Sequence, residues 1–263
     1  MSFVSIIVSA WNRPELLGRF FEDLSKTTYP YELIVHDDGS QVDTQMALIG
    51  LLRKGTISSL ILNPTGYNRG HGTSVNRAAN ISEGDYIVKL NGDETFAVGW
   101  LETAVKTMEM YPEIGILHLA HYYSKAEKHD PIGRVVWDVE PFVIHKENRG
   151  IPLNIVWAGP GCAFMVRKKE WTPWVNTYNP SFGEDVEFRL RMCPMMRSPS
   201  DNPNLRPGAP KDFKAHWEEF KNTPWLALTD PPVVSYHPGA GLCSIYEAQK
   251  TLQKGPHIIC KSS

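Results

Sequence analysis

The sequence lacks long apolar runs, since no stretch approaches the roughly 18 consecutive apolar residues of a membrane-spanning helix. No basic segment precedes the short apolar run at residues 4–10, so we expect a strand there and not a signal peptide. Cysteine is also scarce, with four residues and no CxxC pair, which argues against a four-cysteine zinc site and favours free thiols in a reducing compartment. We therefore expect a cytoplasmic protein, with at most peripheral docking at a membrane.

The sequence also lacks an excess of charge of either sign and has few prolines in its first half. The formal net charge of −2 argues against a general nucleic-acid-binding surface, because such a surface needs many uncompensated Lys and Arg side chains. Only three of the 20 prolines precede residue 112, whereas ten lie at or after residue 194. Because proline interrupts helices and central strands, we expect regular structure before residue 112 and a loop-rich region after residue 193.

Short apolar runs alternate with helical periodicity in the first half of the chain. The runs that predict strands are residues 4–10, 32–36, 60–62, 85–90 and 115–123. Helices are expected between them, the first opened by an Asn12–Glu15 capping box and the second by Ser40 as N-cap. This alternation predicts an α/β fold with a mostly parallel sheet flanked by helices, whose ligands bind beyond the carboxyl ends of the strands.

Acidic residues follow two of these strands. Asp37 and Asp38 end the second strand, where a carboxylate can accept hydrogen bonds from a nucleobase or a ribose hydroxyl. The same residues, with Gly and Ser after them, also suit an ordinary turn and helix cap. Asp93 follows the fourth strand, where a carboxylate can hold Mg²⁺ or Mn²⁺, although Asn91 and Gly92 before it form a favoured tight-turn pair. Each motif alone leaves both interpretations open.

Other segments also have a structural and a functional interpretation. Residues 66–77 hold three glycines ahead of an expected helix, which lets the backbone approach a phosphate, although the pattern is neither GxGxxG nor a P-loop. Glu184 and Asp185 open another expected helix, where they stabilise the helix dipole or provide a general base for a hydroxyl substrate. Five tryptophans pack in the core or contact sugar rings: Trp157, Trp171, Trp174, Trp217 and Trp225.

The order of these motifs is more specific than any one of them. In succession come SIIVSAWNRPE, ELIVHDDGS, the glycine-rich segment, GDYIVKLNGDE, a glycine-led strand and GED, over residues 3–192. This succession resembles glycosyltransferase family 2, whose members are inverting enzymes of the GT-A fold. The resemblance implies a nucleotide-sugar-binding and catalytic core over residues 1–192. The proline-rich residues 193–263 lie beyond the resemblance, and we expect them to complete the same domain as an acceptor region.

The resemblance implies roles for individual residues as well. Asp185, with Glu184 beside it, matches the catalytic base, and Asp93 matches the last aspartate of the DxD motif that binds Mn²⁺ or Mg²⁺. Asn91 stands where many members have the first aspartate of that motif. Some GT-A enzymes add a C-terminal histidine to the metal, for which His237 is the candidate. The implied contacts with the nucleotide sugar are Ala10, Asn12, Asp37, Asp38, Arg69, Gly70, Asn91 and Gly92.

The function implied by the resemblance is metal-dependent transfer of a sugar from a nucleoside diphosphate sugar, with UDP or GDP as the expected nucleotide. The acceptor would be a hydroxyl of a glycan, lipid-linked or protein-linked, in glycan or polysaccharide assembly. Two alternatives come from other classes. A non-catalytic nucleotide- or sugar-binding module with an eroded site would account for Asn91. A nucleotidyltransferase would also use an α/β sheet and Mg²⁺, but it normally carries a basic glycine-rich loop where this chain has AWNRPE.

Overall fold

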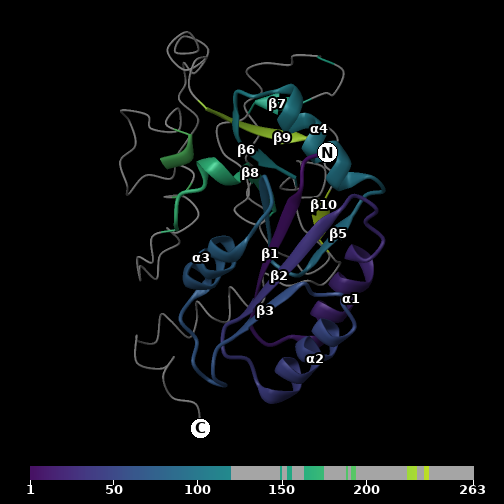
Figure 1. Cartoon of the computed structure of the whole chain (residues 1–263), viewed down its shortest axis with the longest axis vertical. Helices are drawn as coiled ribbons and strands as arrows, with labels where there is room; N and C mark the ends of the chain where they lie inside the picture. The colour runs from purple at the N-terminus through teal and green to yellow at the C-terminus, as the bar shows by residue number, and fades with distance from the viewer. Residues whose placement is uncertain are drawn as a thin grey trace, which may run out of the picture.

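A mixed eight-stranded sheet forms the centre of the protein, with strand order β3-β2-β1-β4-β8-β6-β9-β7 (Figure 1). The computed structural model describes residues 1–119, 149, 153–155, 163–174, 188, 191–193, 224–229 and 234–236. The first four strands are parallel: β1 (Val4–Ala10), β2 (Tyr31–Asp37), β3 (Ser59–Leu62) and β4 (Tyr86–Leu90). Each coincides with a predicted strand to within a residue, which confirms the α/β class.

Four helices in the described part of the chain cover the sheet. They are α1 (Pro14–Leu24), α2 (Val42–Arg53), α3 (His71–Ile81) and α4 (Trp100–Met110). The chain moves outward from β1 through β2 to β3 and then returns through α3 to β4, on the other side of β1. Right-handed crossovers in opposite directions place α3 on the other face of the sheet from α1 and α2 (Figure 1). The strand order therefore reverses between β1 and β4, where open α/β sheets bind ligands.

The first two helices do not begin with the expected caps. Arg13 is the N-cap of α1 in a left-handed conformation with a φ of 62°, and Asn12 is left-handed too, with a φ of 57°. Neither α1 nor α2 has a side-chain hydrogen bond at its N-cap. The capping-box prediction and the Ser40 prediction are therefore wrong. Asn12 and Ser40 bond instead to loops that are distant in the sequence, because those tertiary bonds satisfy them better than a local cap.

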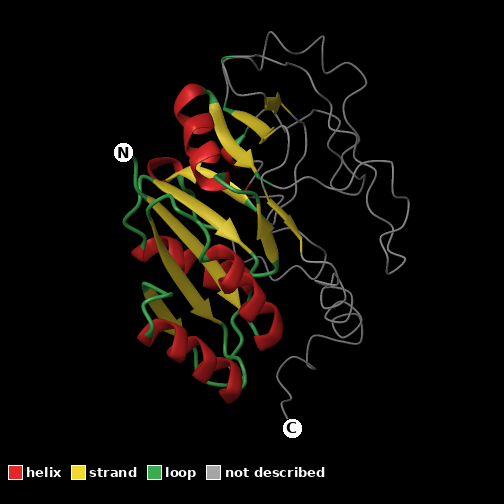
Figure 2. Ribbon diagram, turned by 90° about the vertical axis from the view of Figure 1, so that its right-hand side faces the viewer, coloured by secondary structure: helices red, strands yellow, loops and turns green. Residues whose placement is uncertain are grey.

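The second half of the main sheet departs from the parallel expectation, and Figure 2 shows its strands beside those of the first half. The remaining strands are β5 (Glu94–Phe96), β6 (Ile114–His118), β7 (Leu153–Ile155), β8 (Phe164–Arg167), β9 (Trp225–Thr229) and β10 (Val234–Tyr236). β8 runs antiparallel between β4 and β6, and β9 lies parallel to β6 and antiparallel to β7. β10 pairs antiparallel with β5 in a separate two-stranded sheet. The proline-rich region thus supplies a strand to each sheet.

The core lies between the sheet and its helices. β1, β2 and β4 are buried along most of their length because helices or loops cover both faces of the central strands. The predicted strand over 115–123 is confirmed as far as His118, and residues 120–123 lie outside the described residues. Cys193, among the described residues, is buried and in no disulfide, as expected. No helix in the described part of the chain is long and apolar enough to cross a membrane.

Arg167 fastens the antiparallel strand β8 to the elements beside it. Its guanidinium donates hydrogen bonds to the backbone carbonyls of Met108 at 2.7 Å, Tyr111 at 3.3 Å and Ile114 at 2.5 Å. Met108 lies in the last turn of α4 and Tyr111 is its C-cap, where carbonyls lack partners within the helix. One largely buried cation therefore joins β8, α4 and the start of β6.

Replacing Arg167 with Met should lower the free energy of unfolding by about 3 kcal/mol, since three carbonyls lose a charged donor. Urea unfolding followed by circular dichroism measures the change. Lys106→Met is the matched control, because that exposed lysine of α4 pairs with Glu102 one turn away, at 2.7 Å. Equal effects of the two substitutions would contradict the role given to Arg167.

Candidate functional site

The carboxyl ends of β1, β2 and β4 meet at one edge of the sheet (Figure 1). Ala10 is the register partner of Asp37, and Val8 is that of Leu90. The loops that leave these strands therefore start side by side. The structure brings seven predicted site residues to this edge: Ala10, Asn12, Asp37, Asp38, Asn91, Gly92 and Asp93.

Reciprocal hydrogen bonds tie the first two loops together. The backbone N–H of Asp38 donates to the carbonyl of Ala10 at 2.9 Å. The N–H of Asn12 donates to Ser40 Oγ at 2.7 Å, and the N–H of Gln41 donates to Asn12 Oδ1 at 3.0 Å. These bonds hold Asn12 in its left-handed conformation, which costs about 1–2 kcal/mol for a residue with a side chain. Asn12 and Ser40 therefore fix the shape of the edge.

Asp38 holds the glycine-rich segment against this edge. Its side chain is 2% exposed, and Oδ1 accepts hydrogen bonds from the Arg69 N–H and from Asn63 Nδ2, both at 2.8 Å. Oδ2 accepts a third, from the Gly70 N–H, also at 2.8 Å. A buried carboxylate needs such donors, and here they fix the segment that leads into α3. The predicted contact between Asp38 and a nucleoside stays a prediction.

Asp37 lies deeper in the same polar network. Its Oδ2 accepts hydrogen bonds from the Ser40 N–H at 3.1 Å and from Gln45 Nε2 at 2.7 Å, while no donor among the described residues reaches Oδ1. Gln45 also donates to the carbonyl of Asn63, and Arg77 donates to Asn63 Oδ1. Sequence reasoning missed Gln45, Asn63 and Arg77. Asn63 alone carried a signal, because it directly follows β3 at the same edge.

Two exposed aromatic rings lie at the start of these loops. Trp11, the residue after β1, is 51% exposed, and Tyr67 of the glycine-rich segment is 52% exposed. The Arg69 guanidinium carbon lies 5.3 Å from the centroid of the Tyr67 ring. Flat exposed groups of this kind are surfaces on which a nucleobase can stack. Sequence reasoning missed Trp11, although an aromatic residue at the end of a strand was a visible signal.

A buried carboxylate shapes the loop after β4. Glu94 accepts hydrogen bonds from the backbone N–H groups of Asn91 at 2.7 Å, Gly92 at 2.9 Å and Asp93 at 3.1 Å. Burial, and then the charge of Asp93, raises the pKa of Glu94 to about 7, while the Asn91 N–H and the Lys89 charge oppose the rise. Gly92 has a φ of 91°, which the tight turn requires. Asp93 stays partly exposed at the edge.

A buried lysine lies behind this loop. Lys89 of β4 is 1% exposed; its Nζ donates a hydrogen bond to Asn91 Oδ1 and lies 5.5 Å from the ring centroid of Trp174. Burial, and then the charge of Lys89, lowers the pKa of His71 well below its ordinary value, so this imidazole at the start of α3 is neutral at pH 7. Asn76 of α3 holds Trp174 through two hydrogen bonds to its backbone, both 2.7 Å.

Trp171 and Trp174, two of the five tryptophans named in the sequence, pack against the core. Trp174 is 3% exposed and stacks on Phe164 with ring centroids 6.3 Å apart. Trp171 packs against Phe188 at 5.1 Å between centroids. The core interpretation therefore holds for Trp171 and Trp174. Trp157 and Trp217 lie outside the described residues, and only the backbone of Trp225 is described.

The predicted catalytic and metal-binding residues are described in part. Asp185, Glu184 and His237 lie outside the described residues. No group of three or more His, Cys, Asp or Glu side chains that could hold a metal ion occurs within the residues that the structure describes. Asp93 nevertheless suits Mg²⁺ or Mn²⁺, since such ions are held by one or two carboxylates together with waters and substrate phosphates. Glu94 does not, because its two oxygens already accept three N–H groups.

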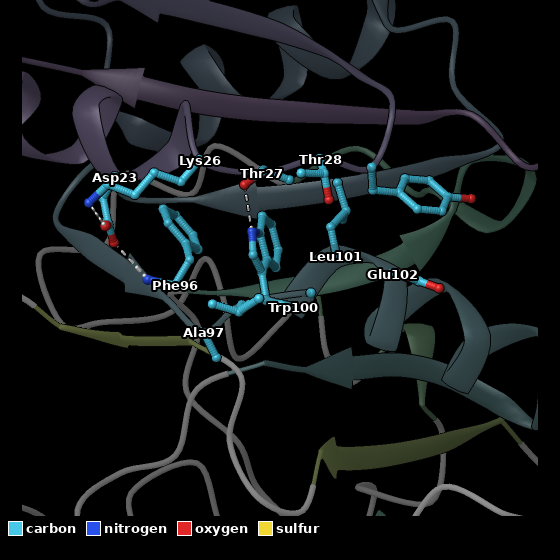
Figure 3. A pocket seen from close by; sticks show the side chains of 12 residues that line it. Asp23, Lys26, Thr27, Thr28, Phe96, Ala97, Trp100, Leu101 and Glu102 are labelled. Atoms are coloured by element: carbon cyan, nitrogen blue, oxygen red, sulfur yellow. Dashed lines mark hydrogen bonds and ion pairs between the residues drawn. The ribbon is translucent and has the colours of Figure 1, made fainter.

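A separate hollow lies between the end of α1 and the start of α4 (Figure 3). Trp100 Nε1 donates to Thr27 Oγ1 there at 2.8 Å, and the Phe96 N–H donates to Asp23 at 2.9 Å. None of the predicted contact residues lines this hollow, so we do not assign it to the site.

The loops at the strand ends lie within a segment of the chain that matches a known protein family. The profile of glycosyl transferase family 2 matches residues 5–171. The chain belongs to this family. A glucosyl-dolichyl phosphate glucuronosyltransferase of Haloferax volcanii is 28% identical over 113 residues, which cover 42% of this chain and 35% of that protein. The chain thus matches about a third of the length of this curated relative.

Solved structures support the same fold. GalNAc-T7, determined with UDP, GalNAc and Mn²⁺, superposes with a TM-score of 0.63 at 14% identity, over 90% of this chain and 44% of that chain. The mannosyltransferase PcManGT of Pyrobaculum calidifontis, in complex with GDP-Man and Mn²⁺, gives a TM-score of 0.53 at 14% identity, over 94% and 60% of the two chains. The GT-A fold expected from the sequence is confirmed.

Gly39→Ala should unfold more easily than Gly55→Ala, although both glycines have a positive φ, of 83° and 74°. A Cβ at Gly39 would lie 2.7 Å from the backbone N and C of Tyr67, whereas nothing lies within 4 Å at Gly55. We expect Gly55→Ala to cost about 1–2 kcal/mol and Gly39→Ala about 2 kcal/mol more. Urea unfolding measures both, and equal costs would mean that the glycine-rich segment does not pack against Gly39.

Proposed function

We propose that the protein transfers a sugar from a nucleoside diphosphate sugar to an acceptor hydroxyl with the help of a divalent metal ion. The observation that carries this proposal is Asp93, which stays partly exposed on a loop fixed by Glu94. This loop adjoins the edge formed by Asp37 and Asp38. A carboxylate so placed suits an ion that bridges to phosphate oxygens, and membership of glycosyl transferase family 2 supports such a use.

Mn²⁺ or Mg²⁺ bound at Asp93 would neutralise charge on the diphosphate leaving group. We propose His237 as a second ligand. Strand pairing supports this choice, because Tyr236, the residue before His237, pairs with Glu94, the residue after Asp93. The two solved structures described above contain UDP or GDP-Man together with Mn²⁺, which supports UDP or GDP as the nucleotide here.

Nucleoside binding would fall to the loops after β1 and β2. The exposed ring of Trp11 offers a stacking surface for the base, and the Arg69 guanidinium beside Tyr67 adds a positive charge near the diphosphate. Asp37, whose buried Oδ1 has no hydrogen-bond partner among the described residues, would accept a hydrogen bond from the nucleoside. Asp38 would act through the segment that it holds in place.

The chemical step would use Asp185, with Glu184 beside it, as general base. The acceptor oxygen would bond to the anomeric carbon, the bond from that carbon to the phosphate oxygen would break, and the proton would pass to the Asp185 carboxylate. One base suffices for inversion, because the hydroxyl attacks the face opposite the departing diphosphate. No covalent sugar–enzyme intermediate is needed.

The acceptor is proposed as a glycan, lipid-linked or protein-linked. The name of the Haloferax volcanii relative includes glucosyl-dolichyl phosphate, which supports the lipid-linked class. A second candidate function is a non-catalytic nucleotide-sugar-binding module, which Asn91 favours because one carboxylate of the usual pair is missing. Slow metal-dependent hydrolysis of a nucleotide sugar in the absence of an acceptor would indicate an enzyme, and its absence would favour the binding module.

The first test is a thermal-shift panel of UDP, GDP, dTDP, CMP and ADP with and without Mn²⁺, applied to the wild type and to Asp93→Ala. A ligand that binds only the folded state raises the Tm, so one nucleotide should stabilise the wild type in a Mn²⁺-dependent way. Asp93→Ala should lose the Mn²⁺-dependent part of the shift. Asp43→Ala, at an exposed aspartate of α2, is the control. An unchanged Mn²⁺ dependence in Asp93→Ala would place the metal elsewhere.

Asp185→Asn should reduce sugar transfer by about 10²–10⁴-fold, since the amide cannot accept the acceptor proton. Nucleotide affinity should stay unchanged, because the base acts on the acceptor and not on the nucleotide. Release of the nucleoside diphosphate from the donor identified in the panel measures the transfer rate. A full transfer rate in this variant would show that the base assignment is wrong.

A further inference from the structure

The Lys89–Asn91 contact determines which way the Asn91 amide faces. An ammonium group has three donors and no acceptor, so the group that meets Lys89 Nζ must be the amide oxygen and not the amide nitrogen. This chemistry resolves the usual ambiguity between the two ends of an asparagine amide. Asn91 Nδ2 consequently points away from Lys89.

Two further observations concern the position of the Asn91 amide and the hydrogen bonds that it makes. The Asn91 N–H donates to Glu94 at 2.7 Å, which fixes the backbone from which the side chain extends. No acceptor among the described residues bonds to Asn91 Nδ2, and Asn91 is partly exposed at the strand-end edge. The site therefore presents an N–H donor at residue 91, two positions before Asp93.

We propose that Lys89 is a positioning residue that turns the Asn91 amide so that Nδ2 donates a hydrogen bond to an oxygen of the donor's diphosphate. This inference rests on the proposed function and names a contact within it. A carboxylate at residue 91 would offer an acceptor and a negative charge, which repel phosphate oxygens unless a cation lies between them. The amide offers a donor, so Asn91 is a functional feature of the site and not a lost metal ligand.

The two interpretations of Asn91 predict opposite orders of affinity. If Nδ2 binds the diphosphate, the wild type should bind most tightly, Asn91→Ala about tenfold more weakly, and Asn91→Asp more weakly still. If residue 91 is instead a degraded metal ligand, Asn91→Asp should bind at least as tightly as the wild type. Isothermal titration calorimetry with UDP or GDP, whichever the wild type binds, in the presence of Mn²⁺ measures this order.

Inorganic pyrophosphate with Mn²⁺ is the second probe, because it lacks the base and ribose. The same order of affinities is expected for pyrophosphate. If the order holds for the nucleotide but all three proteins bind pyrophosphate equally, residue 91 contacts the nucleoside and the diphosphate assignment is wrong.

A double-mutant cycle tests whether Lys89 acts through Asn91. Lys89→Met should weaken nucleotide binding about threefold to tenfold in the wild-type background, since the amide is then free to turn. In the Asn91→Ala background the same substitution should have little further effect, a result that a purely structural role of Lys89 would not produce. Lys89→Arg, which keeps a donor facing Oδ1, should restore part of the affinity lost in Lys89→Met. Equal effects of Lys89→Met in both backgrounds would overturn the positioning role.

Failure of this inference is distinguishable from failure of the proposed function. A wild-type protein that binds no nucleoside diphosphate with Mn²⁺ contradicts the proposed function itself. A wild type that binds, together with an Asn91→Asp variant that binds as tightly, contradicts only the role of the amide. Circular dichroism and the Tm of each variant without ligand show that the comparison is made between folded proteins.

Discussion

A buried carboxylate that accepts three hydrogen bonds is the interaction on which the shape of this site depends, and it occurs twice. Asp38 bonds to the backbone of Arg69 and Gly70 and to Asn63, and Glu94 bonds to three successive N–H groups after β4. A loop at a strand end cannot satisfy these groups within a sheet or a helix. Because leaving them unpaired would cost about 1–3 kcal/mol each, both loops are held in one conformation.

This use of carboxylates separates the acidic residues of the edge into two kinds. Asp38 and Glu94 are buried, and their oxygens accept hydrogen bonds from the protein that shape the loops. Asp93 remains partly exposed and is the acidic side chain of the β4 loop that suits a metal ion. One partly exposed carboxylate of this loop is therefore left for the proposed metal ion, which agrees with an amide at residue 91.

The strands and the edge could be predicted because buried parallel strands read as short apolar runs, and their ends carry the polar residues. The helix caps could not be predicted, since the Asn12 N–H bonds to Ser40 Oγ, 28 residues away in the sequence, and neither side chain caps a helix. The antiparallel direction of β8 could not be predicted either, because an apolar run does not indicate in which direction its strand runs in the sheet. Gln45 and Arg77 lie on helices with no local feature that marks them, and only the tertiary network around Asp37 and Asn63 gives them a role.

Lys89 contacts both Asn91 in the loop after β4 and the ring of Trp174, which α3 holds. It lies on a central strand where an apolar side chain would ordinarily be found, and burying an ammonium group is costly unless nearby groups compensate for lost hydration. The Asn91 oxygen and the face of Trp174 provide part of that compensation, and Trp174 is itself held by Asn76 of α3. A positive charge fixed behind the loop favours ionised Glu94 and disfavours protonated His71. Lys89 therefore orients Asn91 from a position that the core itself holds in place.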